Sequence, residues 1–439
     1  MRCPRAAFLV LVLPGCAVLR DAPDRAAVSA EIERRVGAGV GASSSGAFTL
    51  PEGISLDDGL TEDEAVAVAL WNNAALQADL ATLGIARADL LQAGLLRNPV
   101  LSLLFPVGPK QAEATLALPL AEIWQRPRRV AAAKLDVRRV ADDLVEHGLA
   151  LARDARIALA EVSMSEQRAR LADESARLLD DVASIAEARL SAGDASVLEA
   201  RAARVEALLA REAARRRSQE AESSRYRMLT VLGLEPDGPR IAVSGAIAGP
   251  GPIASLSTLV DRALAARPDL RAAEARIEAE GERAGWERSR AFHLIGLIDA
   301  NETADGGSDV GPGAQVELPI FDWNRSGRLR AAARLQQAAW DYVGVRRRIV
   351  LGVHEAYTRF RSAEAAHREW GEEIVPSLEG ALRQVQSAHA TGEVSRLAVL
   401  EATRRLVEAR VRDAEVLAEL RRERANLLYR VGMDAGGES

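Results

Sequence analysis

Polar and apolar residues alternate with a period of two in short segments of the chain. Between residues 111 and 118 every second residue is apolar, and residues 292–300 and 310–318 show a similar alternation. This pattern predicts strands with one apolar face. An apolar segment, residues 100–105, precedes the first of them across a Pro106-Val-Gly-Pro109 turn signal, and Asp305-Gly-Gly-Ser-Asp309 joins the other two. The sequence therefore predicts two strand pairs, over residues 100–118 and 291–318.

Long segments with helical patterning flank each strand pair. We expect helices over residues 62–96, 127–190, 196–232, 256–290 and 326–390, and from the turn at 392 to Tyr429. Thr61 and Glu64 have the spacing of a capping box that starts the first helix, and Asn98-Pro99 ends it. Gly281 and Gly285 predict a local weakness in the fourth helix, and Pro376 predicts a bend in the fifth.

The whole layout occurs twice, about 200 residues apart. Leu118-Pro119-Leu120 followed by Trp124 returns as Leu318-Pro319-Ile320 followed by Trp323, and the turn at Gly193 returns at Gly392. A duplicated supersecondary unit predicts two halves of one architecture. We place the halves at residues 60–234 and 255–433, with strands over 100–118 and 291–318 and tip turns near 193 and 392. Residues 235–254 form a linker and 434–439 a tail.

Helix lengths indicate how each half is built. The uninterrupted helix after each strand pair has about 65 residues, or ~95 Å, and the two shorter helices of each half match it when stacked end to end. Each half is therefore expected to be an antiparallel pair of rods. Two strands are not stable alone, and a four-stranded sheet leaves two open edges. We expect several copies of the chain to close the sheet.

The N-terminal residues have the layout of an export signal. Arg2 and Arg5 precede an apolar core over residues 6–13, and Leu13-Pro14-Gly15-Cys16 follows. We expect a signal peptide over residues 1–15, lipidation of Cys16, and a flexible leader over residues 16–59; an ordinary secretory signal is the alternative. No other stretch approaches 18 apolar residues, so any membrane crossing must use strands.

Composition and charge exclude several classes of function. The formal net charge is −6, which disfavours nucleic-acid binding. Abundant alanine with only 4% aromatic residues is typical of long helices packed closely together. The chain contains no nucleotide-binding loop and no His-Glu-x-x-His motif, and its two cysteines lie at positions 3 and 16. We therefore predict no enzyme activity, no metal site and no cofactor.

These stretches resemble the TolC-like outer-membrane efflux proteins. The resemblance rests on the segment from Leu60 to Leu76, on Leu318-Pro319-Ile320-Phe321-Asp322 leading to Arg325-Ser326-Gly327-Arg328, and on the two turns Gly193-x-x-Ser196-x-Leu198-Glu199-Ala200 and Gly392-x-x-Ser395-x-Leu397. It implies a mainly α fold with short β: long antiparallel α-helical hairpins that form a trimeric α-barrel, and four strands per chain in a 12-stranded outer-membrane β-barrel. The N-terminal leader with Cys16 resembles that of the lipoprotein branch of the family.

The resemblance also implies partners, a location and a mechanism. It implies a homotrimer in the outer membrane of a Gram-negative bacterium, anchored by lipid, with helices extending into the periplasm. A periplasmic adaptor and an inner-membrane transporter, often of the resistance-nodulation-division class, would supply the substrate. The function would be passive conduction as the exit duct of a tripartite efflux or type I secretion system. The cargo is not identified by the sequence.

Three groups of residues are candidates for function. Carboxylates near the turns are candidates for a periplasmic aperture: Asp194, Glu199, Glu393 and Glu401. A threefold ring of such groups would favour cations; a solvated side chain, or one paired with a neighbouring rod, is the alternative for Glu401. Turn residues are candidates for adaptor contact or for shaping the turns and capping the returning helices: Gly193, Ser196, Gly392 and Ser395. Tryptophans near the strand bases either mark the membrane interface or pack the helix–strand junction: Trp124, Trp286 and Trp323.

A second class of function competes with the duct. Long helical hairpins also occur in periplasmic coiled-coil scaffolds and adaptor-like proteins that have no channel. An adaptor has one hairpin flanked by β-domains, whereas this sequence predicts two hairpins and four short strands. The duct is therefore favoured, and outer-membrane fractionation with heat-modifiable trimer migration separates the two hypotheses.

Overall fold

The computed structural model describes residues 16–41, 48–56, 58–105, 110–236, 253–290, 292–303 and 307–432. The predicted signal peptide, most of the linker and the tail lie outside these residues. Contacts divide the chain into two units, which we describe separately. Unit 1 contains residues 1–28, 78–144 and 268–347, and unit 2 contains residues 29–77, 145–267 and 348–439.

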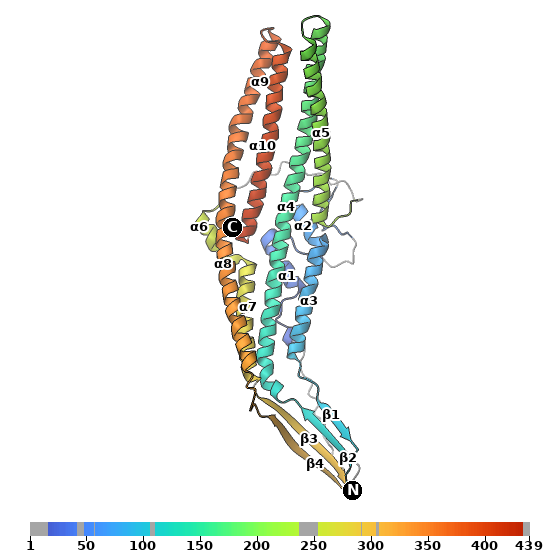
Figure 1. Ribbon diagram of the computed structural model, residues 1–439, viewed down its shortest axis with the longest axis vertical. Helices are drawn as coiled ribbons and strands as arrows, with labels where there is room; N and C mark the ends of the chain where they lie inside the picture. The colour runs from blue at the N-terminus through green and yellow to red at the C-terminus, as the bar shows by residue number, and fades with distance from the viewer. Residues whose placement is uncertain are drawn as a thin grey trace. The chain divides into compact units, whose positions relative to one another are not determined.

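Unit 1 contains one four-stranded antiparallel sheet in the order β1-β2-β3-β4 (Figure 1). The strands are β1 (Val100–Leu104), β2 (Lys110–Leu118), β3 (His293–Thr303) and β4 (Ser308–Glu317). Both predicted strand pairs are confirmed, with boundaries that differ by at most three residues. The central pairing joins β2 to β3, so strands about 180 residues apart in the sequence lie side by side.

Helices account for most of the remaining described residues. A 3₁₀ turn, η1 (Cys16–Leu19), comes first. The α-helices are α1 (Arg25–Val36), α2 (Glu62–Asn72), α3 (Ala74–Gly94), α4 (Ala121–Ser191), α5 (Val197–Leu232), α6 (Leu256–Ala266), α7 (Pro268–Ser289), α8 (Arg325–Arg368), α9 (Val375–Ala390) and α10 (Arg396–Val431). Among the described helices, none contains an apolar stretch long enough to cross a membrane.

Unit 2 contains two long helical hairpins (Figure 1). The C-terminal part of α4 turns into α5 at Gly193, and α9 turns into α10 at Gly392. Small buried residues line the facing surfaces, such as Ala155 in α4, Ala207 in α5 and Ala414 in α10. Alanine lets helices approach closely and has the highest helix propensity. The alanine-rich composition therefore accompanies closely packed long helices, as we predicted. Arg168 of α4 pairs with Glu415 of α10 at 3.4 Å, which links the hairpins.

The helices that precede the strand pairs are each broken once. We predicted continuous helices over 62–96 and 256–290, but Asn73 separates α2 from α3 and Arg267 separates α6 from α7. Pro268 disfavours helical geometry at Arg267, which has an extended conformation (ψ 128°). The expected weakness at Gly281 and Gly285 is wrong, because α7 runs through both glycines.

At each break, a side chain donates a hydrogen bond to the C-terminal end of a hairpin helix in unit 2. Asn73 donates a side-chain hydrogen bond to the carbonyl of Val231 at 3.0 Å, near the end of α5. Arg267 donates to the carbonyl of Tyr429 at 3.0 Å, near the end of α10. Carbonyls at the end of a helix have no partner within the helix, so the two breaks supply the donors that these ends need.

A π-helical segment replaces the bend that we predicted at Pro376. The segment covers Glu369–Ile374 and lies between α8 and α9. Pro376 has no N–H to donate to the preceding turn. The helix widens just before it, and Val375 donates its N–H to the carbonyl of Trp370, five residues back. The side chain of Ser377 donates to the carbonyl of Glu373 at 2.6 Å.

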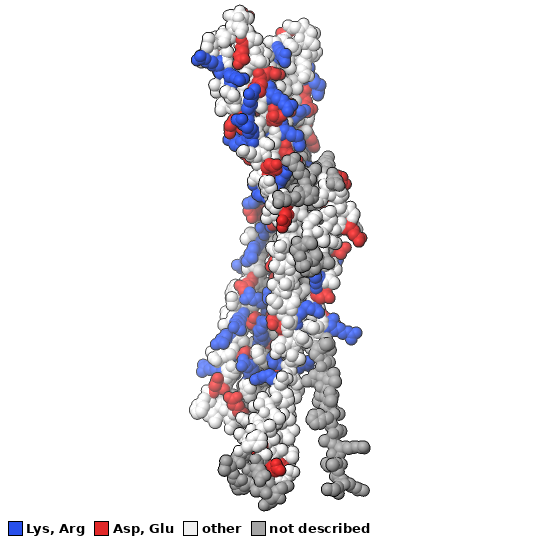
Figure 2. Space-filling view, turned by 90° about the vertical axis from the view of Figure 1, so that its right-hand side faces the viewer, with Lys and Arg blue, Asp and Glu red and all other residues white. Residues whose placement is uncertain are grey.

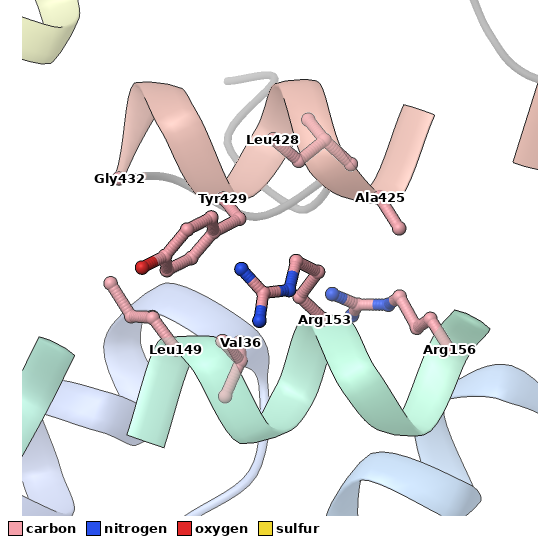
Figure 3. Close-up of a pocket in the computed structure, with 8 residues that line it drawn as sticks. All are labelled: Val36, Leu149, Arg153, Arg156, Ala425, Leu428, Tyr429 and Gly432. Atoms are coloured by element: carbon pink, nitrogen blue, oxygen red, sulfur yellow. The ribbon is translucent and has the colours of Figure 1, made fainter. Parts of the chain in front are cut away.

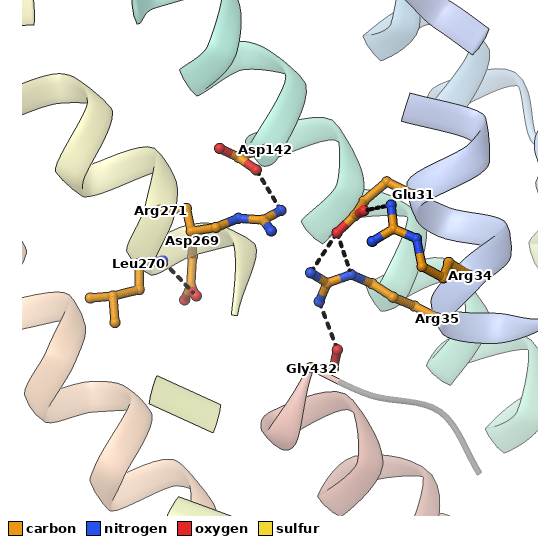
Figure 4. Close-up of polar contacts among 8 residues, drawn as sticks. All are labelled: Glu31, Arg34, Arg35, Asp142, Asp269, Leu270, Arg271 and Gly432. Atoms are coloured by element: carbon orange, nitrogen blue, oxygen red, sulfur yellow. Dashed lines mark hydrogen bonds and ion pairs between the residues drawn. The ribbon is translucent and has the colours of Figure 1, made fainter. Parts of the chain in front are cut away.

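The predicted flexible leader is wrong for residues 25–36, which form α1. In unit 2, Ile32 and Val36 are buried, and Arg35 donates to the carbonyl of Gly432 at 2.8 Å and to Glu31 (Figure 4). The apolar residues Val28, Ile32 and Val36 recur every four positions. This helical period was the signal that a composition-based interpretation missed.

Candidate functional site: the two-faced sheet and the hairpin turns

The strand register places all the apolar alternations on one face of the sheet. Leu101, Leu116, Ile298 and Pro312 form one row across the four strands. The neighbouring row consists of Ser102, Thr115, Asp299 and Gly311, and its side chains project from the opposite face. Because the strands are in register, the alternation within each strand gives the whole sheet two different faces.

The apolar face carries no charged side chain over most of its length. From the row of Leu103, Ala114, Ala300 and Val310 to the pair Leu294–Val316, every side chain on this face is apolar or absent. The carboxylate of Glu302 lies beyond it, at the turn end of β3. Many of these apolar residues are exposed: Leu101 is 60% and Val310 is 70% accessible. A surface this apolar indicates contact with another apolar phase.

The opposite face carries most of the acidic residues of the sheet, together with apolar residues such as Val100, Leu104 and Leu297, and we call it the acidic face. Four carboxylates project from this face in the described strands: Glu113, Asp299, Asp309 and Glu317. Thr115 donates its hydroxyl to Asp299 across the β2–β3 pair at 2.7 Å. One apolar and one acidic face are the alternation of strands that separate lipid from water.

Both edges of the sheet are open within the described chain. β1 pairs only with β2, and β4 pairs only with β3. Each outer edge therefore presents backbone donors and acceptors, which template pairing with another strand. Four strands with two open edges are an incomplete structure in an apolar environment.

A hydrogen-bonded cluster fixes the helices where they meet the strands in unit 1. Glu122, at the start of α4, is buried and accepts from the backbone N–H of Arg97 at 2.9 Å and from the guanidinium of the same residue. Burial alone would raise the pKa of Glu122, but these donors lower it. Asn324 has a positive φ of 54° and donates to the carbonyl of Glu287 at 2.7 Å. The cluster positions the ends of the sheet.

The three candidate tryptophans lie near this junction in different environments. Trp124 is 45% exposed and Trp323 is 54% exposed. Trp323 also packs edge-on against Phe292, with ring centroids 6.2 Å apart. Trp286 is half-buried beneath the guanidinium of Arg290, 5.1 Å from its ring. Trp286 therefore packs within the helix–strand junction, whereas Trp124 and Trp323 have exposed surface that an interface could cover.

The candidate turn residues shape both hairpin ends in unit 2. Gly193 and Gly392 have positive φ values of 81° and 82°, which favour glycine. Ser196 and Ser395 cap the returning helices by accepting from the N–H groups of Glu199 and Ala398. The predicted capping role of these serines is confirmed. Leu198 is 77% exposed beside the first turn, so the turn also presents an apolar contact surface.

The carboxylate of Glu199, an aperture candidate, takes part in the cap of its own helix. Its carboxylate accepts from the N–H of Ser196 at 2.8 Å, which completes a capping box. This backbone hydrogen bond lowers the pKa of Glu199. The cap therefore contributes fully above the ordinary carboxyl range and is lost only as pH falls through the lowered folded pKa. Asp194 and Glu393 lie on the turns themselves and are exposed.

Glu401 is ion-paired within its own helix. Its carboxylate contacts Arg404 at 2.9 Å and Arg405 at 3.3 Å. The hydrogen bond from Arg404 lowers the pKa of Glu401, so the carboxylate stays ionised to lower pH than an isolated one. These pairs lie within α10, so the single chain shows neither the solvated nor the inter-rod paired side chain that we gave as the alternative. Sequence analysis missed both arginines, although their spacing of three and four residues from Glu401 was the available signal.

A cavity in unit 2 is too small for a substrate. It lies between α4 and α10, where Arg153 and Tyr429 face each other 4.4 Å apart (Figure 3). Its volume is about 10 Å³, roughly the room that one water molecule needs. Burial raises the pKa of Tyr429, and the nearby Glu146 raises it further. Within the described residues, no three His, Cys, Asp or Glu side chains are grouped as a metal site.

Comparisons with known proteins agree with this geometry. Residues 259–432 match the family described as outer membrane efflux protein, whose members are channels. The cobalt-zinc-cadmium resistance protein CzcC of Cupriavidus metallidurans is 25% identical over 163 residues, which cover 37% of this chain and 39% of that protein's length.

Two solved structures show the same fold. The outer-membrane channel OprN has a TM-score of 0.70 at 18% identity, with 90% of this chain and 99% of that one covered. The Campylobacter jejuni outer-membrane channel CmeC also has a TM-score of 0.70, at 13% identity, with 90% and 92% covered. Residues 259–432 thus match the outer membrane efflux protein family, and the chain as a whole has the fold of TolC-like outer-membrane channels.

Proposed function

We propose that this protein is the outer-membrane exit duct of a tripartite efflux system and conducts its cargo passively. The observation that carries the proposal is the sheet of unit 1, which has one apolar face, one acidic face and two open edges. Closing the sheet with further copies of the chain would satisfy both edges. It would also turn the apolar faces toward lipid and the acidic faces toward a water-filled bore.

A homotrimer is the assembly that we propose. The chain has the fold of channels such as OprN. The two hairpin turns of unit 2 would meet a periplasmic adaptor and through it an inner-membrane transporter. The exposed Leu198 and the rigid capped turns at Ser196 and Ser395 support this contact.

Lipidation of Cys16 remains part of the proposal. Val18, two residues after Cys16, lies against Gly94 at the end of α3, six residues before β1 begins. Arg87 of α3 donates to the carbonyls of Ala22 and Pro23 at 2.8 and 2.7 Å. The segment after Cys16 therefore runs beside the helix that leads into the sheet. An acyl chain on Cys16 would lie close to the membrane that we propose for the sheet.

Fractionation and gel migration test the proposed function. The protein should co-sediment with the outer membrane, and unheated samples should migrate as trimers that become monomers on boiling. Purified protein added to planar bilayers should produce discrete conductance steps. A soluble periplasmic monomer without channel activity would instead support the scaffold hypothesis.

Divalent metal ions are the cargo class that we propose to test first. CzcC is named for cobalt, zinc and cadmium resistance. The polar face of the sheet carries Glu113, Asp299, Asp309 and Glu317, which favour cations in a bore. Deletion of the gene should sensitise cells to these metals, and a deletion strain with unchanged metal tolerance but increased drug sensitivity would redirect the cargo assignment.

Replacing Glu401 by alanine should shift ion selectivity toward anions. The change releases Arg404 and Arg405 from their carboxylate and adds one positive charge per chain near the second turn. Reversal potentials under a salt gradient measure this shift. Glu408→Ala is a suitable control, because Glu408 lies seven residues further along α10 than Glu401 and pairs with Arg404 at 2.7 Å. A reversal potential that moves equally in both variants would remove Glu401 from the aperture.

A further inference from the structure

Arginine residues are concentrated where the helices of unit 1 meet the sheet. Segments 94–99, 119–130, 284–290 and 318–330 flank the four strands. Together they hold three carboxylates and nine arginines: Arg97, Arg126, Arg128, Arg129, Arg288, Arg290, Arg325, Arg328 and Arg330. The chain as a whole has a net charge of −6, so this local excess is opposite in sign to the rest of the protein. Figure 2 shows Lys and Arg atoms gathered over the helix ends beside the largely uncharged strands.

Four of these arginines are not used by the fold. Glu122 pairs with Arg97 and Arg129, and Glu287 pairs with Arg290. Arg128 pairs with Glu282 at 3.1 Å, and Arg126 donates to the carbonyl of Gly94 at 2.6 Å. The side chains that remain are exposed, and within the described residues they have no hydrogen-bond or ion-pair partner: Arg288, Arg325, Arg328 and Arg330. We call these four residues the basic rim.

Three of the four residues of the basic rim lie at positions that are unfavourable for helix stability. Three of its arginines lie within the first six residues of α8, and the first carboxylate of that helix is Asp341. The N-terminal end of a helix carries a partial positive charge, so cations there are destabilising. A negatively charged partner would remove both this cost and the mutual repulsion of the arginines.

An exposed apolar segment adjoins the basic rim. Between the end of β4 and the start of α8, Leu318 and Ile320 are each 70% exposed and Phe321 is 99% exposed. Apolar and aromatic residues followed directly by arginines are typical of the boundary between the hydrocarbon core and the head groups. Arg325 to Arg330 span about 7.5 Å of helix, comparable to one layer of head groups.

We propose that the basic rim binds the anionic head groups of phospholipids in the periplasmic leaflet of the outer membrane. This inference rests on the proposed function, because the apolar face of the sheet must lie in the bilayer. The planar guanidinium of arginine suits phosphate oxygens through paired hydrogen bonds. Continuity with the apolar face favours a lipid surface over an acidic protein, whose contact would not require the exposed Phe321 and Ile320.

Lipid titration of the purified trimer tests the basic rim. After delipidation in neutral detergent, native mass spectrometry measures the apparent affinity for phosphatidylglycerol and for phosphatidylcholine. The wild type should prefer phosphatidylglycerol. The triple variant Arg325→Gln/Arg328→Gln/Arg330→Gln should weaken phosphatidylglycerol binding at least tenfold, because each arginine near an anionic surface contributes about fivefold. Phosphatidylcholine binding should not change.

A matched triple variant controls for charge. Arg346→Gln/Arg347→Gln/Arg348→Gln removes the same charge from exposed positions further along α8 and should keep the wild-type lipid preference. Equal phosphatidylglycerol affinity in wild type and the rim variant, equal loss in both variants, or full competition by millimolar inorganic phosphate would overturn the inference. Conductance of the rim variant in planar bilayers separates the two proposals: steps without lipid preference reject only the basic rim, whereas a wild type that forms no channel rejects the duct.

Discussion

An arginine in place of Leu101 should prevent the sheet from inserting into lipid vesicles. Leu101 lies in the middle row of the apolar face, in register with Leu116 on β2. Its side chain is 60% exposed, so the single chain has room for arginine and should still fold. An arginine facing lipid near the bilayer midplane costs ~2–4 kcal/mol, and every copy in the assembly carries it. Protease-protected protein recovered with floated vesicles measures insertion.

The adjacent residue provides the matched control. Ser102 is exposed on the acidic face, in register with Thr115. Ser102→Arg introduces the same side chain one position along the same strand, but it would face water and the carboxylate of Asp299. Insertion should be retained, and cation conductance should fall. If the two variants insert equally well, or fail equally, the assignment of the two faces is wrong.

Substitution of Gly233 by alanine should destabilise unit 2 more than any other single methyl addition at a turn glycine. Gly233 ends α5 with a positive φ of 73°. A Cβ there would lie closer than 3.0 Å to backbone atoms of Asn72 and Asn73, at the break between α2 and α3. The left-handed conformation alone costs ~1–2 kcal/mol for a residue with a Cβ. The backbone clash should raise the total to about 3 kcal/mol or more.

Gly193→Ala separates the conformational cost from the clash. Gly193 also has a positive φ, but a Cβ there would meet nothing within 4 Å. This variant should therefore lose only ~1–2 kcal/mol. Thermal unfolding of the purified protein, followed by circular dichroism, compares the two. Equal melting temperatures for the two variants would show that Gly233 is not packed closely against the backbone of Asn72 and Asn73.

Local chemistry predicted much of the fold. The capping box at Thr61, the turns at Gly193 and Gly392, and the four strands follow from short-range rules that act within a few residues. The C-terminal ends of β1, β2 and β4 were predicted well because a proline follows each of them within two residues, at Pro106, Pro119 and Pro319. The capping serines, Ser196 and Ser395, were predicted because a helix cap also depends only on residues within one turn.

Features that depend on distant contacts were missed. The break at Asn73 places its side chain where it donates to the carbonyl of Val231, far along the chain. A local signal was also available and was overlooked, because Asn73 caps α3 by accepting from the N–H of Leu76 at 3.1 Å. At Arg267 the following proline was a usable signal, and it was overlooked. Helix α1 was missed because its polar composition concealed three apolar residues at helical spacing.

The candidate site was predicted unevenly. The two faces of the sheet were visible in each strand, but only the register of β2 with β3 unites them across the two halves. The aperture carboxylates were predicted as candidates for a charged ring, and the structure shows that Glu199 is part of a helix cap and that Glu401 is paired with Arg404. Side-chain pairing within a helix turn depends on rotamers as well as spacing, so sequence alone identifies the candidates without showing which remain free.

Electron cryomicroscopy of the full-length protein in lipid nanodiscs tests the central claim most directly. The account predicts three copies whose sheets join edge to edge, β1 of one copy beside β4 of the next, around an open bore lined by Glu113 and Asp299. A particle containing one chain, with its apolar sheet face covered by its own helices and no bore, would contradict the account.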